Sequence, residues 1–385
     1  MSDILRVDDL ALLFAGLAGL LLAVGAFTSS RGGDGGSEAA LWAIVAGSVA
    51  GVFLARQLIV VLACWQTMVL AVAMIVARQE PRGDRAAFRY ATTTLAGTLA
   101  AVVPVVALGA ARGTFDLNAL AARPVAASGQ VPLALLLAAP FITALPLFPV
   151  HGWAIRAHVA AAVPGALLLS GVVGTAALYA LLRICLPLFP HGMSALAPAL
   201  VALAAVGVLY AAIVAARQGD MRRFLAYASL CHLDLAALAL FAGSPLGVRA
   251  AVIVTVSHAL VVPALLLLAR PRGHRPTWPW YAAVGALIGV PATSGFAAQS
   301  LALVALWERF PLATLVAAAG LVILGWAAVR LLAASDTAAV GPARGPWREH
   351  VLVAPLLAAA VVIGVAPYLI TDRVTDDIPV AERAE

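Results

Sequence analysis

The sequence contains no lysine, so every one of its 24 basic residues is an arginine. Burial can move the pKa of a lysine toward neutrality, whereas an arginine side chain stays charged in proteins. The absence of lysine therefore excludes a buried lysine as a proton carrier. Charge is scarce as well: Asp, Glu, Lys and Arg make up only 11% of the chain, against about 25% in a soluble domain.

Cysteine is also scarce. Cys64, Cys185 and Cys231 all lie within apolar stretches, and their spacing is neither that of a disulfide framework nor that of a zinc or iron–sulfur site. The seven histidines are too dispersed for a metal site, and neither a phosphate loop nor a nucleophile triad appears. We therefore expect no metal, no cofactor and no catalytic residue in this chain.

Apolar side chains dominate instead. Hydrophobic residues form 63% of the sequence and the mean hydropathy is +1.02, which excludes a water-facing surface and predicts an integral membrane protein embedded in a lipid bilayer. The isoelectric point near 9.8 is a weak sign of nucleic-acid binding, because the arginines stand singly between apolar runs rather than in a basic stripe. We expect no nucleic-acid partner.

The predicted fold is all-α, a polytopic helix bundle of about twelve membrane-spanning helices. A crossing helix needs roughly 20 apolar residues, and prolines inside the runs predict kinks or discontinuous helices near the membrane midplane. No linker interrupts the pattern, so we expect a single transmembrane domain over residues 1–385. The predicted spans are 10–27, 39–55, 58–77, 91–111, 131–149, 159–184, 196–216, 224–243, 248–269, 280–306, 311–334 and 351–370, and the prolines are Pro104, Pro140, Pro146, Pro263 and Pro291.

The arginines orient these spans. If both termini lie outside, most of the arginines fall in the inner connections, as the positive-inside rule requires. This pattern predicts that both termini are non-cytoplasmic.

Two stretches resemble a known family. Residues 148–190 contain FPVHGWAIRAH and a helix ending in Tyr179 and Arg183, and residues 216–240 contain GDMRRFLAYASLCH. They resemble the antiporter-like membrane subunits of complex I, group 4 hydrogenases and Mrp antiporters, a family of proton-conducting transporters. The nearest likeness is to the M-type chain of bacterial NADH-quinone oxidoreductase. Residues 257–270 and 289–303 match more weakly, so the family-like core covers about 58–370, and the chain is shorter than a typical member.

The resemblance implies a subunit of a multisubunit respiratory complex in the bacterial inner membrane, with other membrane and peripheral subunits as partners. Any redox chemistry would belong to those partners. In the family, buried glutamate and lysine residues carry protons across the middle of the membrane. The four positions that match those charged residues are neutral in this sequence: Gln66, Ala144, Thr175 and Gln299.

A motif at the predicted cytoplasmic edge also departs from the family. The family has Trp-Leu-Pro-Asp-Ala-His where this chain has an arginine, Arg156, in place of the aspartate. That exchange argues against proton entry at this edge, and the Asp-Met-Arg-Arg segment indicates interfacial anchoring. The residues of this edge motif are His151, Trp153, Arg156, His158, Asp220, Arg222 and Arg223.

A smaller set of ionisable residues remains inside the spans: His232, Asp234 and His258. Ionisable residues inside a membrane are candidate proton-path residues, and histidine can shuttle protons near neutral pH. The alternative is that the two histidines are neutral and hydrogen-bonded across helices, with Asp234 paired to a histidine or facing a partner subunit. Because His232 and Asp234 are two residues apart on a helix, they should point to different faces.

These observations favour a degenerate membrane subunit of a complex I-like assembly that does not itself pump, because the switchable charges are gone. The alternative is a divergent proton or Na⁺ antiporter subunit, or the membrane partner of a bicarbonate-uptake system, that uses His232, Asp234 and His258.

Overall fold

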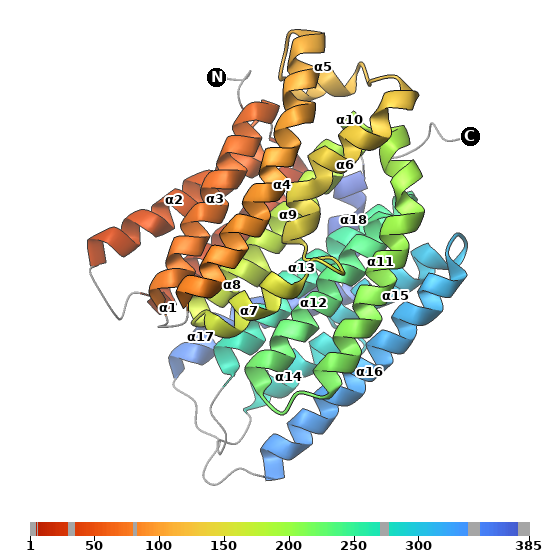
Figure 1. Cartoon of the computed structure of the whole chain (residues 1–385). Helices are drawn as coiled ribbons and strands as arrows, with labels where there is room; N and C mark the ends of the chain where they lie inside the picture. Colours follow the sequence, from red (N-terminus) through yellow and green to blue (C-terminus); the bar gives the residue numbers. More distant parts are fainter. Residues whose placement is uncertain are drawn as a thin grey trace.

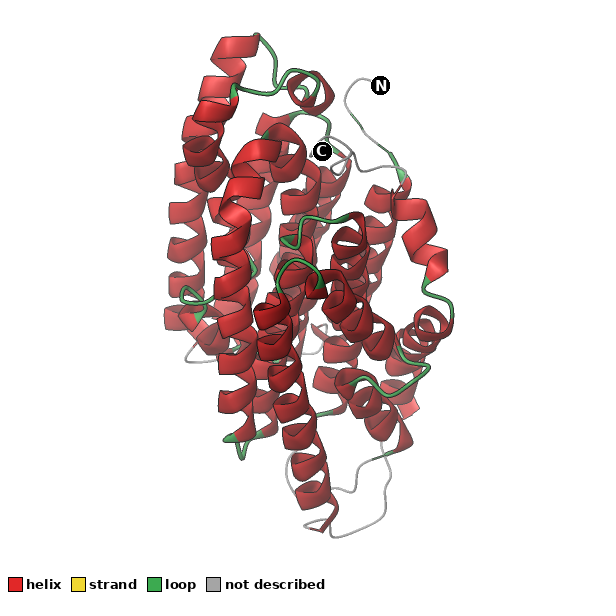
Figure 2. Ribbon diagram, turned by 90° about the vertical axis from the view of Figure 1, so that its right-hand side faces the viewer, coloured by secondary structure: helices red, strands yellow, loops and turns green. Residues whose placement is uncertain are grey.

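The computed structural model describes residue 5 and residues 7–29, 35–79, 83–269, 277–337 and 347–375. Long helices, which the apolar composition predicts, make up nearly all of the described chain and run side by side along the molecule (Figures 1 and 2). Their bounds are α1 Asp9–Ser29, α2 Gly35–Leu54, α3 Leu58–Gln79, α4 Gly83–Arg112, α5 Leu117–Ala121, α6 Ala127–Ala144, α7 Gly152–Ala160, α8 Val163–Leu167, α9 Gly174–Ala180, α10 Leu186–Leu188, α11 Pro190–Ala216, α12 Met221–Leu240, α13 Pro245–Leu268, α14 Trp278–Ile288, α15 Ser294–Trp307, α16 Pro311–Thr337, α17 Trp347–Val365 and α18 Tyr368–Thr375.

The all-α membrane bundle is confirmed. Ten helical stretches of the described chain are long and apolar enough to cross a membrane, and Ser294–Trp307 and His350–Val365 are two shorter apolar helices. Each of these twelve helices overlaps one of the twelve predicted spans. The break between the second and third spans falls at Arg56 and Gln57, where Arg56 forms an ion pair with Asp116.

Two of the predicted spans are not continuous helices. In the span 131–149 the helix α6 ends at Ala144, and a connection that contains Pro146 leads to α7 beyond the span. The span 280–306 divides into α14 and α15, with Pro291 in the connection. Pro104, Pro140 and Pro263 instead remain inside continuous helices. A proline therefore marks a break only where the surrounding backbone also leaves the helical path, as a bilayer tolerates when protein surrounds the exposed carbonyls.

Three elements form the centre of the bundle: residues 163–188, α12 and α13. Nearly all of their apolar windows are buried, whereas α4, α6 and α16 bury well under half of theirs. The stretch 163–188 is one rod in which two π-helical segments, Leu168–Val173 and Leu181–Cys185, separate α8, α9 and α10. Such segments occur frequently at functional sites, and here they lie in the most deeply buried element.

Candidate functional site

The polar side chains of the bundle interior gather on the three central elements. Hydroxyl, imidazole and carboxyl groups would be costly to bury without partners, so their partners define what this interior can do. The buried polar residues on these elements are Ser170, Thr175, Arg183, Ser229, His232, Asp234, Thr255, Ser257 and His258.

Two histidines of neighbouring helices lie next to each other. The ring centroids of His232 on α12 and His258 on α13 are 6.3 Å apart. The Nε2 atom of His258 lies 3.5 Å from Ser229 Oγ and 3.3 Å from the carbonyl oxygen of Ser170. The Nδ1 atom of His232 lies 2.9 Å from the carbonyl oxygen of Ala228. Hydroxyl and backbone groups thus hold both rings in place.

Further polar groups extend this pair on both sides. His158 on α7 is close enough to interact electrostatically with His258. On the other side, the carbonyl of Leu287 lies close to His232 and accepts a hydrogen bond of 3.0 Å from Gln299 Nε2. We name these four side chains, His158, His258, His232 and Gln299, the central polar row. It crosses from α7 to the break between α14 and α15.

Asp234 lies apart from this row. Its side chain is completely buried and packs against Gly207 on α11, where an added Cβ would overlap the carboxylate. Its oxygens lie near the backbone of Phe148, but within the described structure neither oxygen reaches hydrogen-bond geometry with a partner. The three candidate proton-path residues therefore form one histidine pair and one separate carboxyl group.

The four neutral family positions have local roles or none. Ala144 and Thr175 are buried, and the Thr175 hydroxyl donates to the Gly171 carbonyl in the preceding turn. Gln299 donates to a carbonyl that the break after α14 leaves free. Gln66 is half-buried, and its buried amide atoms have no hydrogen-bond partner among the described residues.

The edge motif surrounds an open cavity. Arg156, Arg222 and Arg223 line it together with His151, whose ring lies 4.9 Å from that of Tyr210. Asp220 is not among the residues that line this cavity; it caps α12 by accepting a 3.0 Å hydrogen bond from the Arg223 backbone. This residue acts as an N-cap, the position for which aspartate is favoured.

The other two edge-motif residues point into the protein. Trp153 donates a 2.9 Å hydrogen bond to the Thr143 carbonyl and packs on Tyr90 at 4.8 Å between ring centroids, so it joins the two halves of the broken helix. His158 departs from the sequence interpretation, which grouped it with the edge. The phase of α7 turns its side chain inward, where it is buried and bonded to the Ala154 carbonyl at 2.8 Å.

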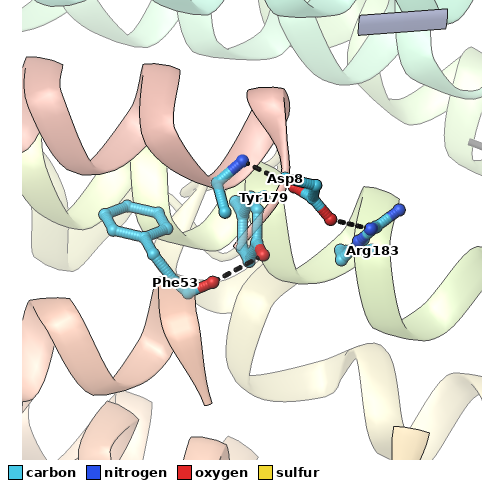
Figure 3. Close-up of polar contacts among 5 residues, drawn as sticks. Asp8, Phe53, Tyr179 and Arg183 are labelled. Atoms are coloured by element: carbon cyan, nitrogen blue, oxygen red, sulfur yellow. Dashed lines mark hydrogen bonds and ion pairs between the residues drawn. The ribbon is translucent and has the colours of Figure 1, made fainter. Parts of the chain in front are cut away.

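The sequence interpretation missed a buried ion pair. Arg183, at the end of the 163–188 rod, forms an ion pair with Asp8 ahead of α1, and Tyr179 donates a 2.8 Å hydrogen bond to the Phe53 carbonyl (Figure 3). Asp8 also caps α1 through the Ala11 backbone at 2.9 Å. The sequence did contain a signal for this pair: Arg183 lies at the end of one apolar run, and Asp8 lies just before the first apolar run of the chain.

No group of three or more His, Cys, Asp or Glu side chains among the described residues lies close enough together to hold an ion. The central polar row offers hydrogen-bonding and titratable groups, which suit proton transfer or structural hydrogen bonding.

Residues 55–325 match the family described as "NADH:quinone oxidoreductase/Mrp antiporter, TM". The match covers well over half of the chain, so the chain belongs to this family. Among similar proteins, NADH-quinone oxidoreductase subunit M of Escherichia coli (strain K12) is 27% identical over 96% of this chain and 80% of that protein. Subunit M of Rhodobacter capsulatus is 29% identical over 75% of this chain and 64% of that protein.

Solved structures share the same fold. A chain of respiratory complex I from Thermus thermophilus with bound NADH superposes with a TM-score of 0.85 at 24% identity, covering 96% of this chain and 84% of that chain. A chain of the Mrp complex from Dietzia sp. DQ12-45-1b superposes with a TM-score of 0.80 at 18% identity, covering 94% of this chain and 81% of that chain. Together with the family match, these likenesses confirm the resemblance that the motifs indicated.

Proposed function

We propose that this chain is a membrane subunit of a complex I-like or Mrp-type assembly, and that it serves as a scaffold which does not itself pump protons. Two findings support the assembly half of the proposal: the chain belongs to this family, and similar proteins are named subunit M. The three deeply buried central elements, residues 163–188, α12 and α13, supply the rigid frame that a scaffold needs.

One observation carries the non-pumping half: neutral side chains occupy all four positions where the family resemblance implies buried charges. A buried Glu–Lys pair stores charge and exchanges it when a neighbouring site changes state. Replacing both partners by neutral groups is often harmless to folding, because it removes desolvation costs of several kcal/mol per ion. Thr175 and Gln299 bond to nearby carbonyls, which fits structural rather than transport roles.

The arrangement of the chain ends supports the proposed topology. The α1 and α18 helices contact each other, whereas the first turn of α4 and the connection after α11 line one cavity at the lower end of the bundle in Figure 1. Arg78 at the end of α3, and Arg217, Arg222 and Arg223 around the α11–α12 connection, give this end its positive charge. By the positive-inside rule, we assign this arginine-rich end to the cytoplasm and both termini to the outside of a bacterial inner membrane.

A histidine relay is the second candidate, favoured by the adjacent rings of His232 and His258 with His158 nearby. A ring separation of 6.3 Å is too long for direct transfer, so a proton would need Ser229 or water between the rings. Asp234 would contribute only from outside the central polar row.

Purification in mild detergent, followed by identification of the co-purifying chains, tests the assembly half. We expect subunits of a respiratory or hydrogenase complex, or other Mrp-type chains. A soluble zinc protein as the sole partner would instead support a bicarbonate-uptake pair and contradict this half.

Two variants in the purified assembly distinguish scaffold from relay. Under the scaffold proposal, Asp234→Asn and His258→Gln leave the proton movement and turnover of the assembly unchanged. Loss of proton movement in His258→Gln, with the assembly still intact by size-exclusion chromatography, would establish the relay. The matched control is Ser300→Ala, a change on α15 outside the central polar row.

A further inference from the structure

The open cavity at the arginine-rich end is lined by five arginines. They come from three different helices: Arg85 and Arg89 from α4, Arg156 from α7, and Arg222 and Arg223 from α12. The cavity encloses about 1040 Å³, which is enough for a phosphorylated headgroup. The cavity is separate from the central polar row, which lies inside the bundle.

Among the residues that the structure describes, no carboxylate lines this cavity. Within the described part of the chain, none of the five guanidinium groups forms an ion pair. Asp220 is beside them in sequence, but its Oδ1 is used to cap α12, and Asp84 is exposed on the first turn of α4. Guanidinium groups cannot lose their charge at neutral pH, so the concave surface holds a concentrated positive field that an anion would neutralise.

The type of donor indicates the type of anion. Arginine presents a planar fork of N–H donors that matches phosphate oxygens in bidentate fashion. Arginines that converge from three helices can contact several oxygens of one phosphate from different directions. The site therefore fits a phosphate-bearing anion better than a diffuse surface of single charges would.

Apolar side chains in the cavity and on the neighbouring surface of α4 fit a lipid. Phe88, between Arg85 and Arg89 on the outer helix α4, is 69% exposed, while Ile155 and Val159 of α7 line the cavity itself. His151 and Tyr210 pack together on one wall, with 4.9 Å between their ring centroids. Apolar side chains next to arginines are what an acyl chain and its headgroup require at a membrane interface.

We propose that this cavity binds the phosphate group of an anionic phospholipid from the leaflet at the arginine-rich end, with the acyl chains lying against the α4 surface around Phe88. Arg156 of α7 and Arg222 of α12 both line the cavity and would bind the phosphate. The proposal is independent of whether the chain conducts protons, since the cavity uses none of the central polar row.

Native mass spectrometry of the protein from nanodiscs tests this directly. The nanodiscs contain equal amounts of phosphatidylglycerol and phosphatidylcholine. We expect the wild-type protein to retain phosphatidylglycerol at least tenfold in excess, and the double variant Arg156→Gln, Arg222→Gln to lose that preference. Arg217→Gln is the matched control, because Arg217 is an exposed arginine at the same end that does not line the cavity.

A second variant keeps the test decisive if the first does not fold. Arg85→Gln with Arg89→Gln changes two exposed side chains of α4, so it should preserve the fold while it reduces phosphatidylglycerol retention several-fold. Equal retention of both lipids by the wild type, or an unchanged preference in both double variants, would overturn the proposal.

Soluble probes identify the source of the phosphate. If inorganic phosphate raises the apparent Tm in phosphatidylcholine nanodiscs, and the arginine variants abolish that effect, the phosphate site stands and its ligand is a soluble ion. If a poly-glutamate peptide binds while neither phosphatidylglycerol nor phosphate does, the cavity is a protein-docking site and the proposal fails.

Discussion

Asp234 is the clearest case of a polar side chain in apolar surroundings. It is a fully buried carboxyl group without a hydrogen-bond partner among the described residues, and it occupies space that only a glycine at position 207 leaves free. A buried carboxyl group with only the backbone of Phe148 nearby is costly, so a stabilising polar contact is a poor explanation for this residue. Its close fit against Gly207 makes the arrangement testable.

Gly207→Ala should lower the free energy of unfolding by about 1–3 kcal/mol, because the added methyl overlaps the Asp234 carboxylate and the packed helices cannot separate freely. In an Asp234→Ala background the same change should cost nothing or be slightly stabilising, since alanine favours the helix over glycine. Reversible denaturation of the four proteins in mixed micelles measures this coupling. Equal effects of Gly207→Ala in both backgrounds would show that the two residues do not touch.

The Asp8–Arg183 pair predicts a different kind of loss. Arg183→Gln should destabilise the protein by about 3–5 kcal/mol, because it breaks an ion pair whose arginine is almost completely buried. The matched control is Arg56→Gln, which breaks the more exposed pair with Asp116 and should cost about 0–1 kcal/mol. Thermal unfolding in detergent compares the two variants. A similar small loss in both would mean that the Asp8–Arg183 pair is effectively solvated.

The positions of the helix breaks, rather than the lengths of the helices, determine how these elements pack. The α14 helix ends at Ile288, Gly289 follows with a left-handed φ of 78°, and α15 begins five residues later. The two halves then pack so closely that a Cβ at Gly295 would overlap the backbone carbonyl oxygen of Ala286. This packing brings Gln299 to the Leu287 carbonyl and so completes the central polar row.

Gly295→Ala should therefore destabilise the protein by about 2–4 kcal/mol, since the clashing atom belongs to the backbone and cannot rotate away. Gly285→Ala is the matched control: its Cβ would lie 3.5 Å from Val290 Cγ2, an ordinary contact, and alanine favours the helix by about 1 kcal/mol. Apparent Tm values should fall for the first variant and hold or rise for the second. The opposite order would contradict the described packing of α14 on α15.

Sequence patterns predicted where these helices lie, but not which of their side chains face the interior. Apolar runs bounded by Arg56 and Gln57 located the α2–α3 break, because a charge and an amide cannot remain in the hydrocarbon region unpaired. The inward turn of His158 was not predictable, because it depends on the length and path of the connection between α6 and α7. The Asp8–Arg183 pair joins residues 175 positions apart, which no local pattern specifies.

For the whole molecule, the twelve spans followed from composition, and the family followed from two motifs. The candidate site followed only in part: the sequence identified His232, Asp234 and His258 as the ionisable residues, and the structure separates the histidine pair from Asp234. The arginine cavity was not foreseen, because its five members lie far apart in the chain and converge only when α4, α7 and α12 pack together. Single arginines in a sequence do not indicate such a surface.

Proton flux through the reconstituted assembly is the most direct measurement of the scaffold claim. With a pH-sensitive dye inside proteoliposomes, an applied potential should drive no more flux through assemblies containing the unmodified chain than through assemblies whose chain carries His258→Gln. The double variant Gln66→Glu, Thr175→Lys, which places charges at two of the neutral positions, is the comparison for any gain. Robust flux through the unmodified chain that His258→Gln abolishes would contradict the account.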